Sequence, residues 1–376
     1  MSTIIASNLQ ASGGTGTAAT LASINGGPIA GARNRIINGD MRIDQRNAGA
    51  AVTVNAAAAF YPVDRIVAYG SNSAGVFTAQ RTTTAPNDFT NAVICTVATA
   101  STPSATHEYG LTHNIEGFNV ADLNWGTANA KTVTVSFWVR SSITGTHSGC
   151  LTNDAYNRSY VFTFTVNQAN TCEYKTVAIA GDTTGTWTTD NSAGIRLRFN
   201  LGAGSSKTTA AGSWSAGYFQ QATGAVTPIS TNSATFYITG VQLEAGSVAT
   251  PFERRSYGQE LALCQRYFER KNYNSASYER IATAFVPGTS TSTLMETAFT
   301  FAEKRALPSV TTSAGNTFRQ NGGNALDNIA TGVSVGTIGM YTFNLAVTGN
   351  SRNSGTVGWI SRENVATTFI EISAEL

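Results

Sequence analysis

Histidines are the side chains best suited to acid–base catalysis near neutral pH, and this chain has three: His107, His113 and His147. None of them stands in a recognisable Ser-His-Asp or Cys-His pattern. His107 and His113 share one segment with Glu108 and Glu116, which leaves a zinc site as an alternative. The segment lacks a known zinc-ligand spacing, such as two histidines four residues apart on a helix, so we expect polar loop residues here.

Paired carboxylates could cleave a glycosidic bond if they lay roughly 5 to 10 Å apart. The nearest pairs along the chain are Asp40 with Asp44, Glu108 with Glu116, and Asp182 with Asp190. Such pairs arise by chance among 22 acidic residues. Because no catalytic set is recognisable, we expect the protein not to be an enzyme.

The cysteines are widely spaced and form no zinc-binding or redox motif. They are Cys95, Cys150, Cys172 and Cys264. We expect free, buried thiols, with a disulfide between Cys150 and Cys172 as the alternative. The disulfide is less favoured because the sequence begins without a visible export signal.

Aromatic side chains beside turns are the best candidates for a binding function. The candidates are Trp125, Tyr156, Tyr160, Trp187 and Trp214. Aromatic rings stack on the apolar face of a pyranose, and neighbouring polar side chains can bind the hydroxyls. These residues predict a carbohydrate-binding surface, with a lid or interface role as the alternative at each position. Trp138 differs because it lies within a predicted strand, where we expect it between sheets or on a concave surface.

The composition limits the functions that these residues can serve. Hydrophobic residues make up 41% of the 376 residues and charged residues only 12%, against about 25% charged in an average domain. The formal net charge is +2, so neither sign dominates and nucleic-acid binding is not expected. No stretch approaches the roughly 20 apolar residues of a membrane span, so no membrane insertion is expected.

Short apolar runs separated by turn residues fill residues 35–253 and predict an all-β sandwich or barrel. The clearest strands are 131–140, 160–166, 195–200 and 235–243. A second, smaller β domain is expected over residues 272–376. Its predicted strands are 293–301, 309–312, 340–347, 355–361 and 367–375.

The period changes to that of a helix between these domains. Tyr257, Leu261, Cys264 and Phe268 recur at spacings of four, three and four residues. Ser256 and Gln259 stand in the relation of a capping box, so we expect a connecting helix within 254–271. Its apolar stripe either covers a β domain or meets other copies of itself about a three-fold axis.

The first 34 residues are rich in Gly, Ala, Ser and Thr and show neither period. Such a segment cannot build a core of its own. We expect an extended arm over 1–34, either a flexible linker or an anchor that orders against another protein.

Three segments resemble bacteriophage tail-fibre and other virion fibre proteins. They are 38–47 (NGDMRIDQRN), 241–253 (VQLEAGSVATPFE) and 255–269 (RSYGQELALCQRYFE). The middle domain, with SFWVR at 136–140 and FYITGVQLE at 236–244, also looks like a jelly-roll carbohydrate-binding module. The resemblance covers most of residues 35–270, and 301–316 (FAEKRALPSVTTSAGN) looks like the C-terminal domain of the same group.

The resemblance implies a structural protein of the bacteriophage virion, assembled in the host cytoplasm and joined to other virion proteins through its arm. It implies an all-β fold with a jelly-roll β-sandwich, one short connecting helix and a smaller C-terminal β domain. It also implies a homotrimer that binds bacterial surface polysaccharide during adsorption without cleaving it. The alternatives are a glycan-degrading tail spike and a capsid-surface head fibre or decoration protein.

Jelly-roll modules of the kind that the middle domain resembles often bind calcium. The resemblance therefore makes Asp40, Asp44 and Asp64 candidates for a structural calcium site. Capped turns are the favoured interpretation of these aspartates, and no other cofactor is expected.

Overall fold

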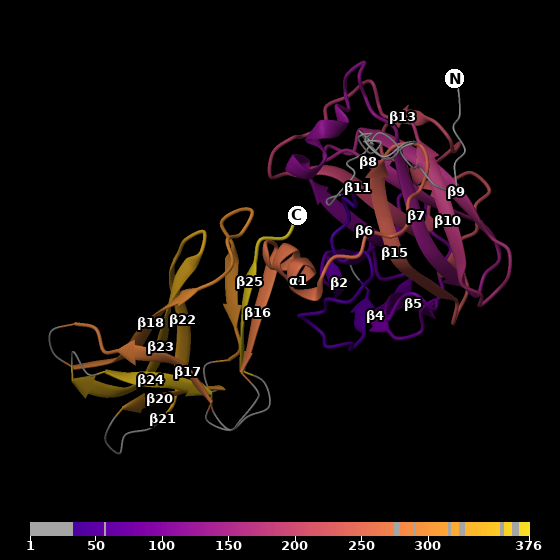
Figure 1. Cartoon of the computed structure of the whole chain (residues 1–376). Coiled ribbons are helices and arrows are strands. Elements are labelled where there is room, and N and C mark those ends of the chain that lie inside the picture. The colour runs from indigo at the N-terminus through magenta and orange to yellow at the C-terminus, as the bar shows by residue number, and fades with distance from the viewer. Residues whose placement is uncertain are drawn as a thin grey trace, which may run out of the picture.

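The computed structural model describes residues 33–55, 58–273, 279–288, 291–314, 317–322, 328–353, 357–362 and 368–376. The expected arm therefore lies outside the described residues, except for its last two. The predicted all-β class is confirmed, because nearly all regular elements are antiparallel strands. Figure 1 shows a larger and a smaller β domain on either side of the helix α1. No helix in the described ranges is long and apolar enough to cross a membrane.

The larger domain is a sandwich of two sheets. The first sheet has the order β1 (Val52–Val54), β4 (Val76–Thr82), β5 (Ala92–Thr99), β15 (Thr235–Ala245), β7 (Val133–Ser141), β10 (Glu173–Ile179). The second has the order β13 (Trp214–Ala216), β9 (Arg158–Val166), β8 (Gly145–Thr152), β11 (Ala193–Ala203), β6 (Glu108–Glu116), β3 (Ile66–Gly70), β2 (Phe60–Val63). Strands distant in sequence are neighbours in both sheets, as in a jelly roll.

Short elements complete this domain. They are the parallel pair β12 (Thr208–Thr209) and β14 (Gln221–Ala222), and the 3-10 turns η1 (Gly117–Asn119), η2 (Ala121–Leu123), η3 (Ser205–Lys207) and η4 (Pro228–Ser230).

The core of the sandwich follows from the alternation seen in the sequence. Along β7, Val133, Val135, Phe137 and Val139 are at most 1% exposed. The ring of Phe137 packs edge-to-face against Phe199 of the opposite sheet, at 4.9 Å between centroids. Aromatic pairs of this geometry add about 0.5–1.5 kcal/mol to the burial of their surface. The four strands predicted for this domain are therefore confirmed.

The segment 38–47 fixes the start of the domain against later elements. The side-chain amide of Asn38 donates to the backbone oxygens of Ile43 and Asp64 at 2.8 and 2.9 Å. Its side-chain oxygen accepts from the backbone nitrogen of Ile43 at 2.9 Å. The backbone nitrogen of Asn38 donates to Glu260 of the helix. This motif thus joins the sandwich to α1.

The helix α1 (Tyr257–Gln265) begins with the predicted capping box, in which Ser256 and Gln259 bond reciprocally. It ends earlier than expected, and Phe268 is the first residue of strand β16 (Phe268–Tyr273). The prediction of Phe268 in a helical stripe is therefore wrong. The reason is that Phe268 pairs with Ser373 of β25 (Thr368–Ser373), a strand more than 100 residues away.

The smaller domain consists of two sheets and has its own core. A three-stranded sheet has the order β16, β25, β19 (Ser309–Thr312). A seven-stranded sheet has the order β21 (Asn328–Ile329), β20 (Phe318–Gly322), β24 (Val357–Arg362), β17 (Arg280–Phe285), β18 (Thr291–Thr300), β23 (Thr342–Asn353), β22 (Gly332–Ile338). Fully buried Met295, Phe318, Phe343 and Ile360 lie in this core. All five predicted C-terminal strands are present; 309–312 has the predicted bounds and the other four have shifted ends.

A buried charged junction connects the two domains. Arg65 of the sandwich is 3% exposed, lies 3.5 Å above the ring of Tyr267 and pairs with Glu375 near the end of the chain. Arg305 donates to the backbone oxygens of Ala374 and Glu375, both at 2.7 Å. Leu376 packs against the apolar cluster that contains Cys264 of α1.

Candidate functional site

Four of the five predicted binding residues lie together in one tryptophan cluster, formed by Trp125, Trp187, Trp214 and Tyr160. The three indole rings meet edge-to-face, with centroids 4.7 to 5.3 Å apart. Tyr160 of β9 lies 5.3 Å from Trp214, its cross-strand partner on β13. The cluster extends the core of the sandwich, because Trp125 is 8% exposed and the other three pack against that core.

The polar atoms of the tryptophan cluster are used within the protein. The indole nitrogen of Trp125 donates to the oxygen of Lys131 at 2.8 Å. Those of Trp187 and Trp214 donate to the oxygens of Thr184 and Ala180 at 3.1 and 2.8 Å. A pocket of about 150 Å³ borders Trp125 and Trp187. The cluster therefore has few atoms left with which to bind a sugar.

An ion pair holds the loop that carries Trp187. Arg158 of β9 donates two hydrogen bonds to Asp182, at 2.7 and 2.8 Å. Burial opposes ionisation of Asp182, but the hydrogen bonds from Arg158 and Thr184 outweigh it and lower the pKa of this carboxyl. The aspartate thus acts as a structural anion, whereas the sequence suggested it only as one of a chance carboxylate pair.

The fifth predicted residue, Tyr156, lies elsewhere, on the outer face of the second sheet. It lines a pocket of about 400 Å³ together with Tyr69, Arg196 and Arg198. The ring of Tyr218 packs on that of Tyr156, at 4.6 Å between centroids. We call these five residues the tyrosine pocket.

A third set of aromatic residues lies on the outer face of the first sheet and borders a groove of about 510 Å³. Trp138 of β7 is half-buried and faces Tyr174 of β10, its cross-strand partner, at 5.5 Å between centroids. Tyr174 is 44% exposed. We call the surface formed by Trp138, Tyr174, Phe89 and Phe252 the aromatic groove.

The far wall of the aromatic groove is held by contacts between distant segments. Phe89 packs edge-to-face on Phe252 at 5.2 Å, and the guanidinium of Arg254 lies 4.8 Å from the ring centre of Phe89. Asp88, Ser136 and Thr250 add polar groups to the lining. Exposed rings flanked by a few polar groups are the usual composition of a sugar-binding surface.

The sequence left Trp138 either between sheets or on a concave surface and did not count it among the sugar-binding residues; it also did not single out Tyr174, Phe89 and Phe252. The segment 173–179 (EYKTVAI) does carry a strand pattern that could have indicated Tyr174. The pairing of β10 with β7 and the approach of residue 252 to residue 89 have no local signal in the sequence.

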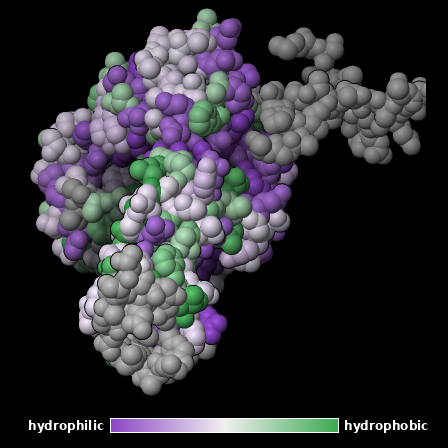
Figure 2. Space-filling model, turned by 90° about the vertical axis from the view of Figure 1, so that its left-hand side faces the viewer, coloured by the Kyte–Doolittle hydropathy of each residue, from purple (hydrophilic) through white to green (hydrophobic). Residues whose placement is uncertain are grey.

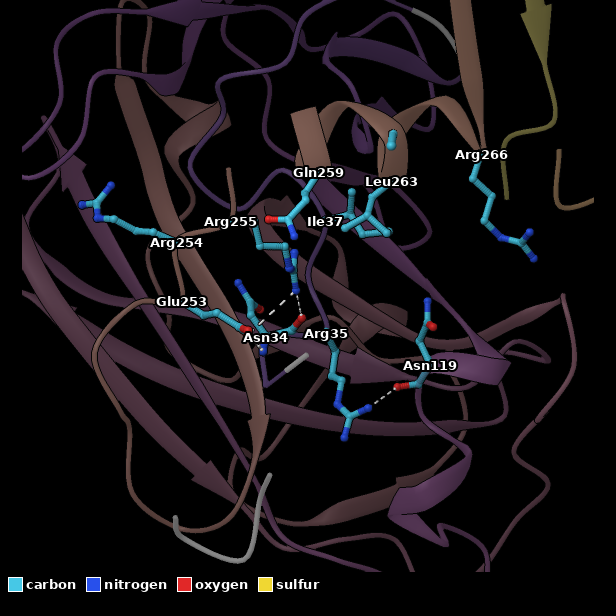
Figure 3. A pocket seen from close by; sticks show the side chains of 11 residues that line it. Asn34, Arg35, Ile37, Asn119, Glu253, Arg254, Arg255, Gln259, Leu263 and Arg266 are labelled. Atoms are coloured by element: carbon cyan, nitrogen blue, oxygen red, sulfur yellow. Dashed lines mark hydrogen bonds and ion pairs between the residues drawn. The ribbon is translucent and has the colours of Figure 1, made fainter. Parts of the chain in front are cut away.

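A cavity of about 750 Å³ lies where the described chain begins beside α1 (Figure 3). Arg255 reaches the backbone oxygen of Asn34, and Arg35 donates to that of Asn119 at 3.0 Å. Leu263 of α1 lies against one side of the cavity.

The predicted oligomerisation residues differ in how far their side chains are exposed. Tyr257 is 58% exposed and Leu261 is half-buried. Cys264 and Phe268 are buried inside this chain at 0% and 3% exposure. A contact between copies could therefore involve only the Tyr257 and Leu261 end of the predicted stripe.

The histidines do not converge on one another. His107 accepts from the backbone nitrogen of Ser104 at 3.2 Å, and His113 is buried beside Ile37. Burial and nearby Arg65 lower the pKa of His113 well below its ordinary value, so its imidazole is neutral. His147 is buried against Phe164, and burial lowers its pKa as well.

The three candidate calcium ligands each have a local partner. Asp40 pairs with Arg42, and Asp44 accepts from the backbone nitrogens of Asn47 and Gly49 in a turn. Asp64 accepts from Gln45, and burial raises its pKa to about 6. Within the described ranges no group of three or more His, Cys, Asp or Glu is placed to hold a metal ion.

The four cysteines are free thiols, and all except the half-buried Cys172 are buried. The alternative of a disulfide between Cys150 and Cys172 is therefore wrong for this structure. Cys150 lies beneath the tyrosine pocket and packs with Val161 and Ala222.

Comparison with known proteins yields matches of shape only. No family model matches the sequence, and no curated protein sequence matches it. Among solved structures, the enzymatically active domain of bacteriophage CBA120 tailspike protein 4 is 11% identical, with a TM-score of 0.28; the match covers 57% of this chain and 21% of that one.

Two binding proteins also match. A family 11 carbohydrate-binding module from Clostridium thermocellum, solved with a mixed-linked tetrasaccharide, is 12% identical with a TM-score of 0.26, over 54% of this chain and all of that one. A putative sugar binding protein from Bacteroides thetaiotaomicron is 12% identical with a TM-score of 0.32, over 56% and 99% of the two chains. These low values assign no role to any residue of this chain.

Proposed function

We propose that this chain is a structural fibre protein of a bacteriophage virion whose sandwich domain binds a bacterial surface polysaccharide without cleaving it. The observation that carries the proposal is the aromatic groove, where Trp138 and Tyr174 present adjacent rings beside polar groups. A groove of about 510 Å³ is large enough for part of an oligosaccharide chain. Weak binding suffices, because several copies on one particle act together.

The test is a binding assay on host-derived polysaccharide with Trp138→Ala and Tyr174→Ala. Each variant should weaken binding about tenfold through the lost stacking. Phe118→Ala is a matched control, since Phe118 is an exposed aromatic residue on η1, outside the groove. Unchanged binding in both groove variants would refute the proposed site.

The same incubation tests the absence of catalysis. Sizing of the polysaccharide before and after incubation should show chains of unaltered length. Shortened chains would establish the alternative of a glycan-degrading spike and overturn the proposal. Antibody labelling of intact particles distinguishes a tail fibre from a head fibre or decoration protein.

The proposal includes a homotrimer, with contacts near the exposed Tyr257 and half-buried Leu261 of α1. Leu261→Asp should then dissociate the trimer before the sandwich unfolds, as measured by native mass spectrometry. A stable wild-type monomer at micromolar concentration would contradict the three-fold arrangement.

The N-terminal arm is proposed to join the chain to other virion proteins. A chain starting at Asn34 should fold normally but fail to enter particles, because Asn34 already supplies the buried bonds to β15, at 3.1 Å to both Val241 and Leu243. A loss of thermal stability beyond a few degrees would show instead that the arm belongs to the fold.

A further inference from the structure

The tyrosine pocket surrounds an arginine whose charge has no direct counterpart. Arg198 of β11 is 6% exposed, and its guanidinium lies 4.7, 5.2 and 5.3 Å from the ring centres of Tyr69, Tyr156 and Tyr218. It donates to the hydroxyl of Tyr156 at 3.0 Å and to the side chain of Gln220 at 3.4 Å. Both acceptors are neutral. No carboxylate among the described residues pairs with Arg198.

The same face of the sheet carries several buried polar atoms without a partner. Residues two apart on a strand share a face, so Arg196, Arg198 and Asn200 lie in a row on the outer side of β11. The Nε atoms of both arginines and both amide atoms of Asn200 have no hydrogen-bond partner among the described residues. Thr152, the cross-strand partner of Arg196 on β8, has an unpartnered hydroxyl. A buried polar group of this kind destabilises the fold when it is left unsatisfied.

The charged side chains around the tyrosine pocket are of both signs. Arg196 pairs with Asp154, and Lys207 lies 4.0 Å above the ring of Tyr218. Glu108 is the remaining acid; it accepts from Tyr218 and Gln220, so Gln220 stands between Glu108 and Arg198. Arg196 and Lys207 thus have Asp154 and the ring of Tyr218 as direct partners, whereas Arg198 has no carboxylate partner among the described residues; Glu108 and Leu376, the last residue of the printed sequence, also line the pocket.

We propose that the tyrosine pocket binds the carboxylate of an acidic sugar residue, with Arg198 as the principal contact and Tyr156 at the rim. A guanidinium offers five donors and binds carboxylates through paired, charge-assisted hydrogen bonds. The half-buried ring of Tyr156 offers the ring of the sugar a stacking surface. A pocket of about 400 Å³ admits a single sugar residue with its neighbour. This site is independent of the aromatic groove, which lies on the other sheet.

The test uses the full chain and one oligosaccharide in two forms. The first form contains glucuronic acid, and in the second each carboxyl group has been reduced, so that glucuronic acid has become glucose. Calorimetric titration should show the acidic form binding about tenfold more tightly, the expected effect of a charged hydrogen bond. The preference should shrink as the salt concentration rises.

Two variants locate the effect. Arg198→Lys keeps the charge but loses the paired donors, and it should abolish most of the preference. Tyr156→Phe keeps the ring and is the safer variant if Arg198→Lys folds poorly. It removes the hydroxyl that accepts from Arg198 and so frees one donor of the guanidinium. The affinity for the acidic form should change, and the affinity for the reduced form should stay the same.

Trp138→Ala is the matched variant on the other sheet, and it should leave the preference in place even if it weakens binding of neutral polysaccharide. A result that refutes sugar binding in the aromatic groove can therefore be distinguished from one that refutes carboxylate binding in the tyrosine pocket. Equal affinity for the two oligosaccharides, or an undiminished preference in Arg198→Lys, would overturn the assignment. Displacement of the acidic form by sulfate at equal concentration would overturn its specificity for carboxylate.

Discussion

Two aromatic clusters are built on strands of the second sheet, and they differ in how their polar atoms are satisfied. The tryptophan cluster faces the inside of the sandwich, and each indole nitrogen donates its single hydrogen to a backbone oxygen. The tyrosine pocket faces outward and encloses a guanidinium whose Nε has no acceptor. Aromatic rings therefore stabilise the fold in the tryptophan cluster, whereas in the tyrosine pocket polar groups are left for a ligand. The polar partners, more than the rings, distinguish a core from a site.

The largest expected effect separates two tryptophans of opposite kinds. Trp125→Ala should lower the free energy of unfolding by about 3–5 kcal/mol, because a buried indole is lost from a packed cluster. Trp138→Ala should lower it by about 1.5 kcal/mol or less, because its side chain is half-buried on an outer face. Denaturant unfolding followed by circular dichroism measures both. Equal losses would remove the distinction between core and surface aromatics.

The next effect concerns the ion pair beside the tryptophan cluster. Asp182→Asn should cost about 1.5–3 kcal/mol at pH 7, the usual contribution of hydrogen bonds to a charged group. The pKa of Asp182 is lowered in the folded state, so its stabilisation is present above the unfolded pKa of about 3.9 and is lost as the pH falls through the folded value.

The difference in stability between wild type and Asp182→Asn should therefore shrink as the pH falls below about 4. Asp190→Asn is the control, because Asp190 is exposed and caps only a local turn at Ser192. A difference that stays constant with pH would show that Asp182 does not act through its charge.

A smaller effect is expected in the tyrosine pocket. Tyr156→Phe removes one hydroxyl that accepts from Arg198 and should cost about 1 kcal/mol of unfolding free energy. Tyr160→Phe is the matched control in the tryptophan cluster, where the packing of the ring is unchanged. A larger loss at Tyr160 than at Tyr156 would reverse the comparison between the clusters.

The smallest effect is chemical and leaves the fold intact. Burial raises the pKa of Cys150 to about 12, so this thiol under the tyrosine pocket stays protonated. Half-buried Cys172 should react with a maleimide at pH 8 well before Cys150 does. Mass spectrometry of the labelled protein gives the order, and early labelling of Cys150 would show that the pocket opens readily.

Hydrophilic and hydrophobic residues intermingle over much of the side of the molecule that Figure 2 shows. Low charge was evident from the composition, and it is the basis of the expectation that the protein binds no nucleic acid. The contribution of the few charges was not evident, since Arg65 and Arg198 are buried and Arg65 pairs with the half-buried Glu375.

The sequence by itself determined the local structure of this protein. Alternation at period two predicted the strands β7, β9, β11 and β15, and the Ser256 and Gln259 capping box predicted the start of α1. These patterns are readable because each residue's preferred conformation and the face that it presents depend on near neighbours. The sequence did not predict where the helix ends, because Phe268 pairs with Ser373 of a strand near the end of the chain.

Only the tertiary structure decided which residues meet. The five predicted aromatic residues looked alike in the sequence, yet four pack together and Tyr156 lies beside Arg198 on another face. Tyr174 joins Trp138 only because β10 pairs with β7. Contacts of this kind depend on the pairing of distant strands in a jelly roll. A single sequence carries no local signal for that pairing, because it is set by the free energy of the whole core.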